Sequence, residues 1–403
     1  MVIRKEVNSM GALTITTKVK LDLDEHQTAL LQDTITAFRD ACNYLSKYAH
    51  EHHESNQYAL HKACYHDIRN IFGLKAQMTQ SVIRIVAARY NSALTNQHKN
   101  VDTGEWVKSC ITFTKSDVQF VYGKDYRMTS NGTIRLSTPY GLLDCIMQGH
   151  DGMFDGSVKL GTATLYRSHH KYYLLIPMTM DVPDNPELIY QQIVGIDRGI
   201  RFVMCTYDLD GHTVFVSGRQ IKRIRAKYKA LRSSLQARKT RSSRRRLKAI
   251  GSREHRWISD INHCISKALV ESNPANTLYV LENLSGIRSA LTKVKHNNRY
   301  LMVSWPYYDL QSKIEYKAKR RGGDVIYVNP KYTSQTCPRC EYRNKWNRNQ
   351  HIHTFICKAC GYHTNDDRAA AMNILAKGKR ELAKMRKAQM ANQASTGETT
   401  DSK

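Results

Sequence analysis

Two Cys-x-x-Cys pairs near the C-terminal end constrain the fold of this chain more than any other feature. Cys337-Pro-Arg-Cys340 and Cys357-Lys-Ala-Cys360 are separated by sixteen residues, a spacing typical of four-cysteine zinc sites. Each pair forms a tight turn that presents two thiolates, and four thiolates complete the tetrahedral shell of Zn²⁺ with no open position. The sequence therefore predicts a closed, structural zinc ribbon. A redox-active pair, the alternative, would not need a matching second pair.

The remaining six of the ten cysteines are scattered singly along the chain. Secreted scaffolds space their cysteines densely along a short chain, so a reducing cytosol is the expected compartment. Apolar runs stay well short of the roughly 20 residues of a membrane-spanning helix, and the chain does not open with a signal peptide. We expect a cytoplasmic protein without a membrane partner.

The charge balance points to a polyanionic partner. The chain has 62 Lys and Arg against 35 Asp and Glu, a formal charge of +27, and such an excess needs an acidic partner to neutralise it. Residues 219–256 hold sixteen Lys or Arg and a single acid, Glu254, yet keep helix-spaced apolar positions. A solvated helix face is the alternative, but so many like charges repel one another unless phosphates lie nearby. We expect a nucleic-acid-binding helical hairpin whose candidate contacts are Arg223, Arg225, Lys239, Arg241, Arg244, Arg245, Arg246 and Lys248.

Residue patterns divide the N-terminal half into a β module with a helical insertion. The opening segment alternates up to residue 23 and reads as a strand, and Asp24 is placed to cap a helix. Apolar residues then recur at helical spacing from Glu25 to about Tyr48 and again from Gln80 to Leu94. Short alternating runs broken by Gly and Asn follow between residues 110 and 181, which predicts an antiparallel barrel completed by the first strand.

The C-terminal half alternates between strands and helices. Residues 193–207 read as one apolar strand that forms a hairpin with residues 213–217. The pattern continues with a helix at 257–270, a strand at 277–281, a helix at 306–321 and a strand at 324–328. Such alternation is typical of an α/β domain.

One carboxylate lies inside an apolar strand, one directly follows another apolar strand, and two adjacent ones begin a late helix. Asp197 lies in GIDRG and Glu282 in YVLENLSG, where an acid is costly to bury without a metal or a partner. A turn carboxylate and a helix-capping acid are the respective alternatives. Asp366 and Asp367 are adjacent in TNDDRAAAMNIL, at a helix start where one of them could be a cap. The residues alone leave the choice between these two aspartates open.

Converging carboxylates of this kind suit phosphodiester hydrolysis. Two divalent cations roughly 3.5 to 4 Å apart can activate a water and stabilise the departing oxyanion, and Mg²⁺, or Mn²⁺ in its place, prefers oxygen ligands and keeps several waters. In an RNase H-like sheet the acids come from the first strand, the end of the fourth strand and the start of a late helix. We expect Asp197, Glu282 and one of the two adjacent aspartates to converge in such a sheet.

The motifs GIDRG and LENLSG, the paired Cys-x-x-Cys turns and D-x-x-A-A-x-N-I before a basic tail resemble those of the TnpB proteins of insertion sequences, relatives of compact type V CRISPR effectors. The resemblance implies an RNA-guided DNA endonuclease with a RuvC-type site at Asp197, Glu282 and Asp367. It also implies a structured guide RNA and a double-stranded DNA target beside a short recognition motif. A protein of this family would be of prokaryotic type and nucleoid-associated. A nuclease-inactive RNA-guided repressor would have been favoured by an incomplete acidic set, and a transposase would act on DNA without guide RNA.

The expected architecture combines a multidomain α/β fold with a β-barrel. An N-terminal wedge-type barrel carries a helical recognition insertion, and a RuvC-like nuclease domain carries the inserted zinc ribbon, which binds target nucleic acid. The expected boundaries are 1–24 for the first barrel strand, 25–105 for the recognition helices, 106–182 for the rest of the barrel, 183–192 for a linker, 193–332 for the nuclease domain, 333–363 for the ribbon, 364–380 for the last nuclease helix, and 381–403 for a disordered basic and polar tail.

Overall fold

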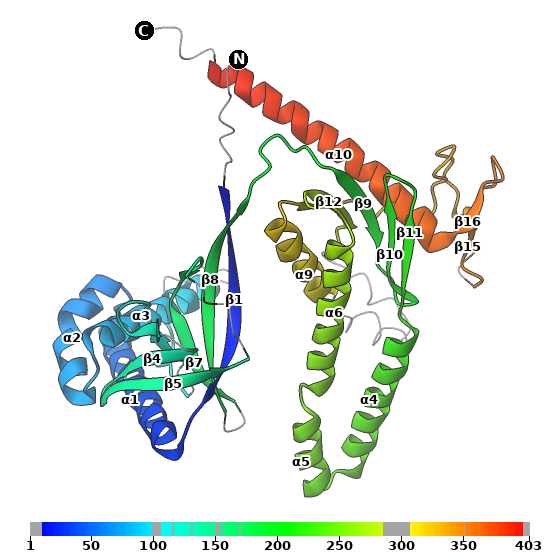
Figure 1. Ribbon diagram of the computed structural model, residues 1–403. Coiled ribbons are helices and arrows are strands. Elements are labelled where there is room, and N and C mark those ends of the chain that lie inside the picture. Colours follow the sequence, from blue (N-terminus) through cyan, green and yellow to red (C-terminus); the bar gives the residue numbers. More distant parts are fainter. Residues whose placement is uncertain are drawn as a thin grey trace. The chain divides into compact units, whose positions relative to one another are not determined.

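The computed structural model (Figure 1) describes residues 10–98, 106–114, 117–129, 132–149, 154, 156–168, 171–284, 307–349 and 351–397. The chain divides into two compact units, Thr14–Asp181 and Met1–Leu13 together with Val182–Lys403. Expectations for residues 1–9, 99–105, 285–306 and 398–403 lie outside the described residues. No helix in the part of the chain that the structure describes is long and apolar enough to cross a membrane.

A nearly closed β-barrel forms the first unit. Its strand order is β2-β7-β8-β1-β5-β4-β3, with β6 paired to β8, and a bridge between Tyr122 and Tyr126 brings the two end strands together. The first strand lies between β8 and β5, so the prediction of a barrel completed by that strand is confirmed. The strands are β1 (Met10–Asp22), β2 (Val118–Phe120), β3 (Tyr126–Thr129), β4 (Thr133–Thr138), β5 (Gly141–Gln148), β6 (Lys159–Leu160), β7 (Ala163–Ser168) and β8 (Lys171–Pro183).

Three helices are inserted between β1 and β2: α1 (Glu25–Glu51), α2 (Gln57–Phe72) and α3 (Ala76–His98). Asp24 caps α1 through a capping box with Gln27, which satisfies backbone donors at the helix start. The buried faces of the helices, for example Phe38 and Val86, join one apolar cluster with barrel residues such as Val118. Helix and barrel therefore share a single core.

A five-stranded sheet organises the second unit, with the order β11-β10-β9-β12-β13. Strand β9 is parallel to β12 and β12 to β13, whereas β10 is antiparallel to β9 and to β11. The strands are β9 (Gln192–Asp197), β10 (Phe202–Asp208), β11 (Thr213–Ser217), β12 (Thr277–Glu282) and β13 (Asp324–Val328). The helices are α4 (Arg219–Arg238), α5 (Arg241–Ile250), α6 (Arg253–Glu271), α9 (Tyr307–Arg320) and α10 (Asp366–Gly397).

Helices cover both faces of this sheet. Val194 and its neighbours on one face pack with residues of α6 and α9, and Ile193, Leu278 and Val280 on the other face pack with Ile374 of α10. Gly195 lets α10 approach β9 closely, because a Cβ there would lie 2.3 Å from the Ala371 carbonyl oxygen. In Figure 1, α10 lies along this face of the sheet.

Two expectations about this unit are wrong. The single strand expected at residues 193–207 is two strands, because the chain turns sharply after Asp197 and the Gly199 amide donates to the Phe202 carbonyl at 3.0 Å. The tail expected to be disordered from residue 381 is helical up to Gly397. Its Leu382 is buried in the α10 cluster and its Arg386 donates to the Leu188 carbonyl at 2.7 Å, and the segment is rich in strong helix formers.

Candidate active site and metal centre

Two carboxylates end adjacent parallel strands at the same edge of the sheet. Asp197 is the last residue of β9 and Glu282 the last of β12, and the register that pairs Leu281 with Ile196 brings the two strand ends side by side. Because side chains alternate along a strand, Asp197 and Glu282 share the face of Ile193 and Val280, which α10 covers. The two acids therefore face the N-terminal part of α10.

Arg198 fixes the relation between these strand ends. Its side chain is buried, and Nη2 donates to the Glu282 carbonyl oxygen at 2.7 Å. The bond crosses from the end of β9 to the end of β12. A hydrogen bond from a buried guanidinium is among the stronger ones in proteins, so the positions of the two carboxylates are coupled through the backbone.

The two aspartates at the start of α10 differ in their surroundings. Asn365 is the residue that caps the helix, since its Oδ1 accepts from the amides of Asp367 at 3.0 Å and Arg368 at 3.1 Å. Asp366 is fully buried, and its Oδ2 accepts from Nε of Arg348 at 2.9 Å. Asp367 is partly exposed, with Oδ1 3.8 Å from Nη2 of Arg348. Asp366 is thus committed to an internal ion pair, whereas Asp367 keeps oxygen atoms free of a short bond to a cation.

Burial raises the pKa of all three carboxylates, and neighbouring acids add to the effect at Asp197 and Asp367. Burial, and then the nearby charges of Glu282 and Asp367, raise the pKa of Asp197 to about 8, against the opposing effect of Arg348. Burial also raises the pKa of Glu282 and of Asp367, the latter with a contribution from Asp366. Crowded acids of this kind favour either a proton or a bound cation. The donor set consists of oxygen atoms, which suits Mg²⁺ or Mn²⁺.

Thr333 holds Glu282 from the segment that follows β13. The Thr333 hydroxyl is buried and donates to Oε1 of Glu282 at 2.6 Å. Asn373 of α10 holds that segment in turn, because its Nδ2 donates to the carbonyl oxygens of Thr333 and Thr336 at 2.7 Å each. Helix α10 therefore supports Glu282 through two hydrogen bonds in series while its first turn carries Asp367.

Neither Thr333 nor the contacts of Asn373 were foreseen from the sequence. The available signal was Asn373 itself, an amide inside the apolar run AAAMNIL, since a buried polar side chain needs a partner. Its partners lie 37 and 40 residues earlier in the chain, a separation that no local pattern encodes.

The four cysteines form a compact cluster. Their Sγ atoms all lie within 4.8 Å of one another, with 3.7 Å between Cys337 and Cys360 and 3.5 Å between Cys340 and Cys357. Four thiolates at about 2.3 Å from a tetrahedral Zn²⁺ are separated by about 3.8 Å. Both turns have the same shape, with a positive φ after the second cysteine, at Glu341 and at Gly361. The cluster fits a structural zinc ion.

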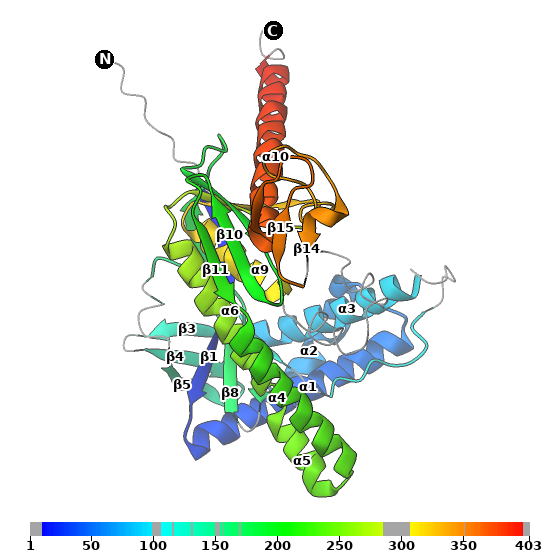
Figure 2. The same ribbon diagram turned by 90° about the vertical axis from the view of Figure 1, so that its right-hand side faces the viewer.

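The ribbon around this cluster is joined to the start of α10. Its sheet comprises β14 (Arg348–Asn349), β15 (Thr354–Ile356) and β16 (His363–Asn365), which lie beside α10 in Figure 2. Ala369 of α10 packs with Cys337, Phe355 and Cys357. Arg348 of β14 ion-pairs with Asp366, whereas Trp346, two residues earlier, is 69% exposed.

Helices α4 and α5 form the basic hairpin. Seven of its eight candidate contacts are exposed: Arg223, Lys239, Arg241, Arg244, Arg245, Arg246 and Lys248. The expectation for Arg225 is wrong, because its side chain is 1% exposed and its Nε lies 3.3 Å from Oε1 of Glu254. Glu254 also pairs with Arg232. The one acid of the segment therefore holds α4 against α6, and Arg225 is a structural residue.

Comparisons with known proteins agree with these observations. The family model described as Cas12f1-like, TNB domain, matches residues 307–374. The CRISPR-associated endodeoxyribonuclease Cas12f1 of Syntrophomonas palmitatica is 32% identical over 270 residues, 61% of this chain and 52% of that protein. The TnpB-like protein MJ0751 of Methanocaldococcus jannaschii is 30% identical over 232 residues, 55% of this chain and 80% of that protein.

A solved structure has a similar fold. That of the mini-RNA-guided endonuclease CRISPR-Cas_phi3 superposes with a TM-score of 0.51 and 10% identity, over 91% of this chain and 93% of that one. The chain spans about half the length of the Cas12f1 relatives it matches.

Proposed function

The chain belongs to the TnpB family, and we propose that it is an RNA-guided DNA endonuclease that cuts target DNA beside a short recognition motif. One further relative, 28% identical over 237 residues, carries the name putative RNA-guided DNA endonuclease InsQ, from Escherichia coli. The observation that carries the proposal is the convergence of Asp197, Glu282 and Asp367 at one edge of the sheet.

The sheet supports a RuvC-type, RNase H-like assignment. Three antiparallel strands, β9 to β11, are followed by two parallel strands on the other side of β9. The acids lie at the end of the first strand, at the end of the fourth strand and at the start of the last helix. Acids that converge from these three positions could hold the two closely spaced cations of two-metal nuclease chemistry.

Asp197, Glu282 and Asp367 would hold two Mg²⁺ or Mn²⁺ ions, which supply Lewis acidity for the attacking water and the departing oxygen. Glu282 is oriented by Thr333, and all three acids must lose their protons before they can act as ligands. Asp366 is not a ligand in this proposal, because its buried carboxylate is neutralised by Arg348. The same ion pair ties the zinc ribbon to the first turn of α10, so the ribbon positions Asp367.

Guide RNA and target double-stranded DNA are the proposed partners. The exposed cations of α4 and α5 provide surface for phosphates, and Trp346 with Lys345 provides an exposed ring for a base. We assign residues 1–24 and 106–182 to a wedge barrel and 25–105 to recognition. The linker at 183–192, the RuvC-like segments 193–332 and 364 onward, and the ribbon at 333–363 complete the proposed organisation.

The decisive experiment uses the full chain purified with the RNA that accompanies it. That RNA is sequenced, and plasmids carrying matching targets are incubated with the complex and Mg²⁺. The wild-type complex should cut, and Asp197→Ala should abolish cutting while RNA and DNA binding persist. Asp260→Ala, which removes an exposed acid from α6, is the matched control and should cut normally.

Three results would contradict the proposal. Cutting by Asp197→Ala at the wild-type rate would show that Asp197 is not part of the active site. RNA-directed DNA binding without cutting by the wild type would indicate an RNA-guided repressor. Selective binding to DNA ends in the absence of RNA would indicate a transposase.

A further inference from the structure

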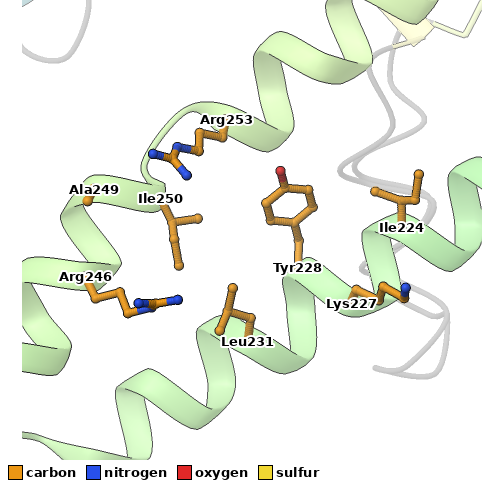
Figure 3. Close-up of a pocket in the computed structure, with 8 residues that line it drawn as sticks. All are labelled: Ile224, Lys227, Tyr228, Leu231, Arg246, Ala249, Ile250 and Arg253. Carbon is orange, nitrogen blue, oxygen red and sulfur yellow. The ribbon is translucent and has the colours of Figure 1, made fainter.

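A pocket of about 480 Å³ opens in the basic hairpin, between α4 on one side and α5 with the start of α6 on the other (Figure 3). Its walls include Tyr228 and Leu231 from α4 and Ile250 from α5. Three cations, Lys227, Arg246 and Arg253, also line it. We propose that this pocket binds one unstacked nucleotide of a single-stranded nucleic acid. The inference deepens the proposed function and rests on it for the identity of the strand.

The interior of the pocket suits a base. Figure 3 shows the ring of Tyr228 projecting into the space between Ile250 and Ile224. Tyr228 is half-buried and Leu231 is 37% exposed, so an apolar and aromatic surface remains open to water. A nucleobase has a flat π-face that stacks on a tyrosine ring whatever its sequence identity.

The charges at the pocket suit phosphates. No acidic residue lines it, and Glu254, the only acid between residues 219 and 256, is engaged by Arg225 and Arg232. Within the described ranges, Lys227, Arg246 and Arg253 have no ion pair. The pocket therefore has an apolar interior and these three cations beside it. A nucleotide is complementary to such a site, because its base offers an apolar face and its phosphate a negative charge.

A single strand fits this site better than a duplex does. In a duplex the base faces are covered by their neighbours, so the Tyr228 ring would have no π-face to stack on. A single strand can offer one base to the ring while its flanking phosphates contact Arg246 and Arg253. Guide RNA and unwound target DNA share this chemistry, and separate RNA and DNA probes distinguish them.

The test measures binding of short fluorescent oligonucleotides to the full zinc-loaded chain without added Mg²⁺. The probes are single-stranded RNA, single-stranded DNA, a DNA duplex and an abasic strand of equal length. Tyr228→Leu should weaken binding of the preferred single strand about tenfold, the loss of one stacked base. Tyr228→Phe keeps the ring and should bind as the wild type does. Duplex and abasic probes should not distinguish Tyr228→Leu from the wild type.

A matched pair of charge variants separates a pocket from a diffuse basic surface. Arg246 lines the pocket, whereas Arg244 is an exposed arginine of the same helix outside it. Arg246→Gln should weaken single-strand binding more than Arg244→Gln does. Equal losses in the two variants, or unchanged binding by Tyr228→Leu, would overturn the proposal.

Failure of this inference can be told apart from failure of the proposed function. The binding measurements do not depend on DNA cutting. If the wild type and the variants bind the probes as expected but the wild type never cuts DNA, only the proposed nuclease activity is contradicted. A wild type that cuts RNA-matched plasmids while Tyr228→Leu binds every probe normally contradicts only the pocket.

Discussion

Asp197→Asn should abolish cutting and at the same time stabilise the protein in the absence of Mg²⁺. The carboxyl lies at the end of β9 facing Glu282 and Asp367, and burial together with these charges raises its pKa to about 8 from an ordinary 3.8. The amide has the same shape and no charge. The amide therefore stays neutral without binding a proton, but it also removes the metal ligand.

The change of the free energy of unfolding with pH follows from proton binding to Asp197. Between pH 3.8 and 8 the folded state keeps a proton on Asp197 that the unfolded chain releases, so stability falls as pH rises through this window. The slope is about 1.4 kcal/mol per pH unit for one such group, which amounts to about 2 kcal/mol between pH 6.0 and pH 7.5. The stability advantage of Asp197→Asn over the wild type should grow by that amount over this range.

Urea unfolding of both proteins at pH 6.0 and pH 7.5, with zinc and without Mg²⁺, measures this difference. Mg²⁺ should then stabilise the wild type at pH 7.5 and have little effect on the variant. Asp366→Asn is the contrasting control, because it breaks the buried pair with Arg348 and should destabilise the chain at both pH values. A difference between wild type and Asp197→Asn that stays constant with pH would refute the electrostatic argument.

Three other substitutions test the supports of the site. Thr333→Val removes the hydrogen bond to Glu282, which is worth about 1.5–3 kcal/mol for a charged acceptor. It should raise the Mg²⁺ concentration for half-maximal cutting about tenfold, and Thr333→Ser should restore the wild-type value. Equal Mg²⁺ requirements in Thr333→Val and the wild type would show that Thr333 does not orient Glu282. Cys357→Ser should lower zinc content, melting temperature and cutting together, because binding of the metal is part of folding; unchanged zinc stoichiometry would count against the ribbon. Gly195→Ala should cost about 1–3 kcal/mol of stability through the clash with the α10 backbone, and a melting temperature equal to the wild type would show that α10 does not pack on β9 as described.

The zinc ribbon, the barrel and the strand-then-acid pattern could all be predicted from the sequence, because each rests on local spacing. Two residues between cysteines suffice to form a thiolate turn, and alternation along a strand determines which side chains share a face. Asp197 and Glu282 were identifiable as candidates because an acid within or directly after an apolar strand is costly to bury without a metal or a partner. The third acid was left at Asp366 or Asp367, because the two are adjacent at a helix start and either could have been the cap.

Tertiary packing decided what local spacing left open. Only the position of Arg348 distinguishes the buried, paired Asp366 from Asp367, and only the position of Glu254 separates the buried Arg225 from its exposed neighbours. The segment after residue 380 continues α10, and its Leu382 is buried in the apolar cluster between α10 and the sheet. In each case the contacting residue is distant in the chain. The free energy of burying a charge or an apolar side chain depends on the residues that surround it in the fold, and local sequence patterns do not contain that information.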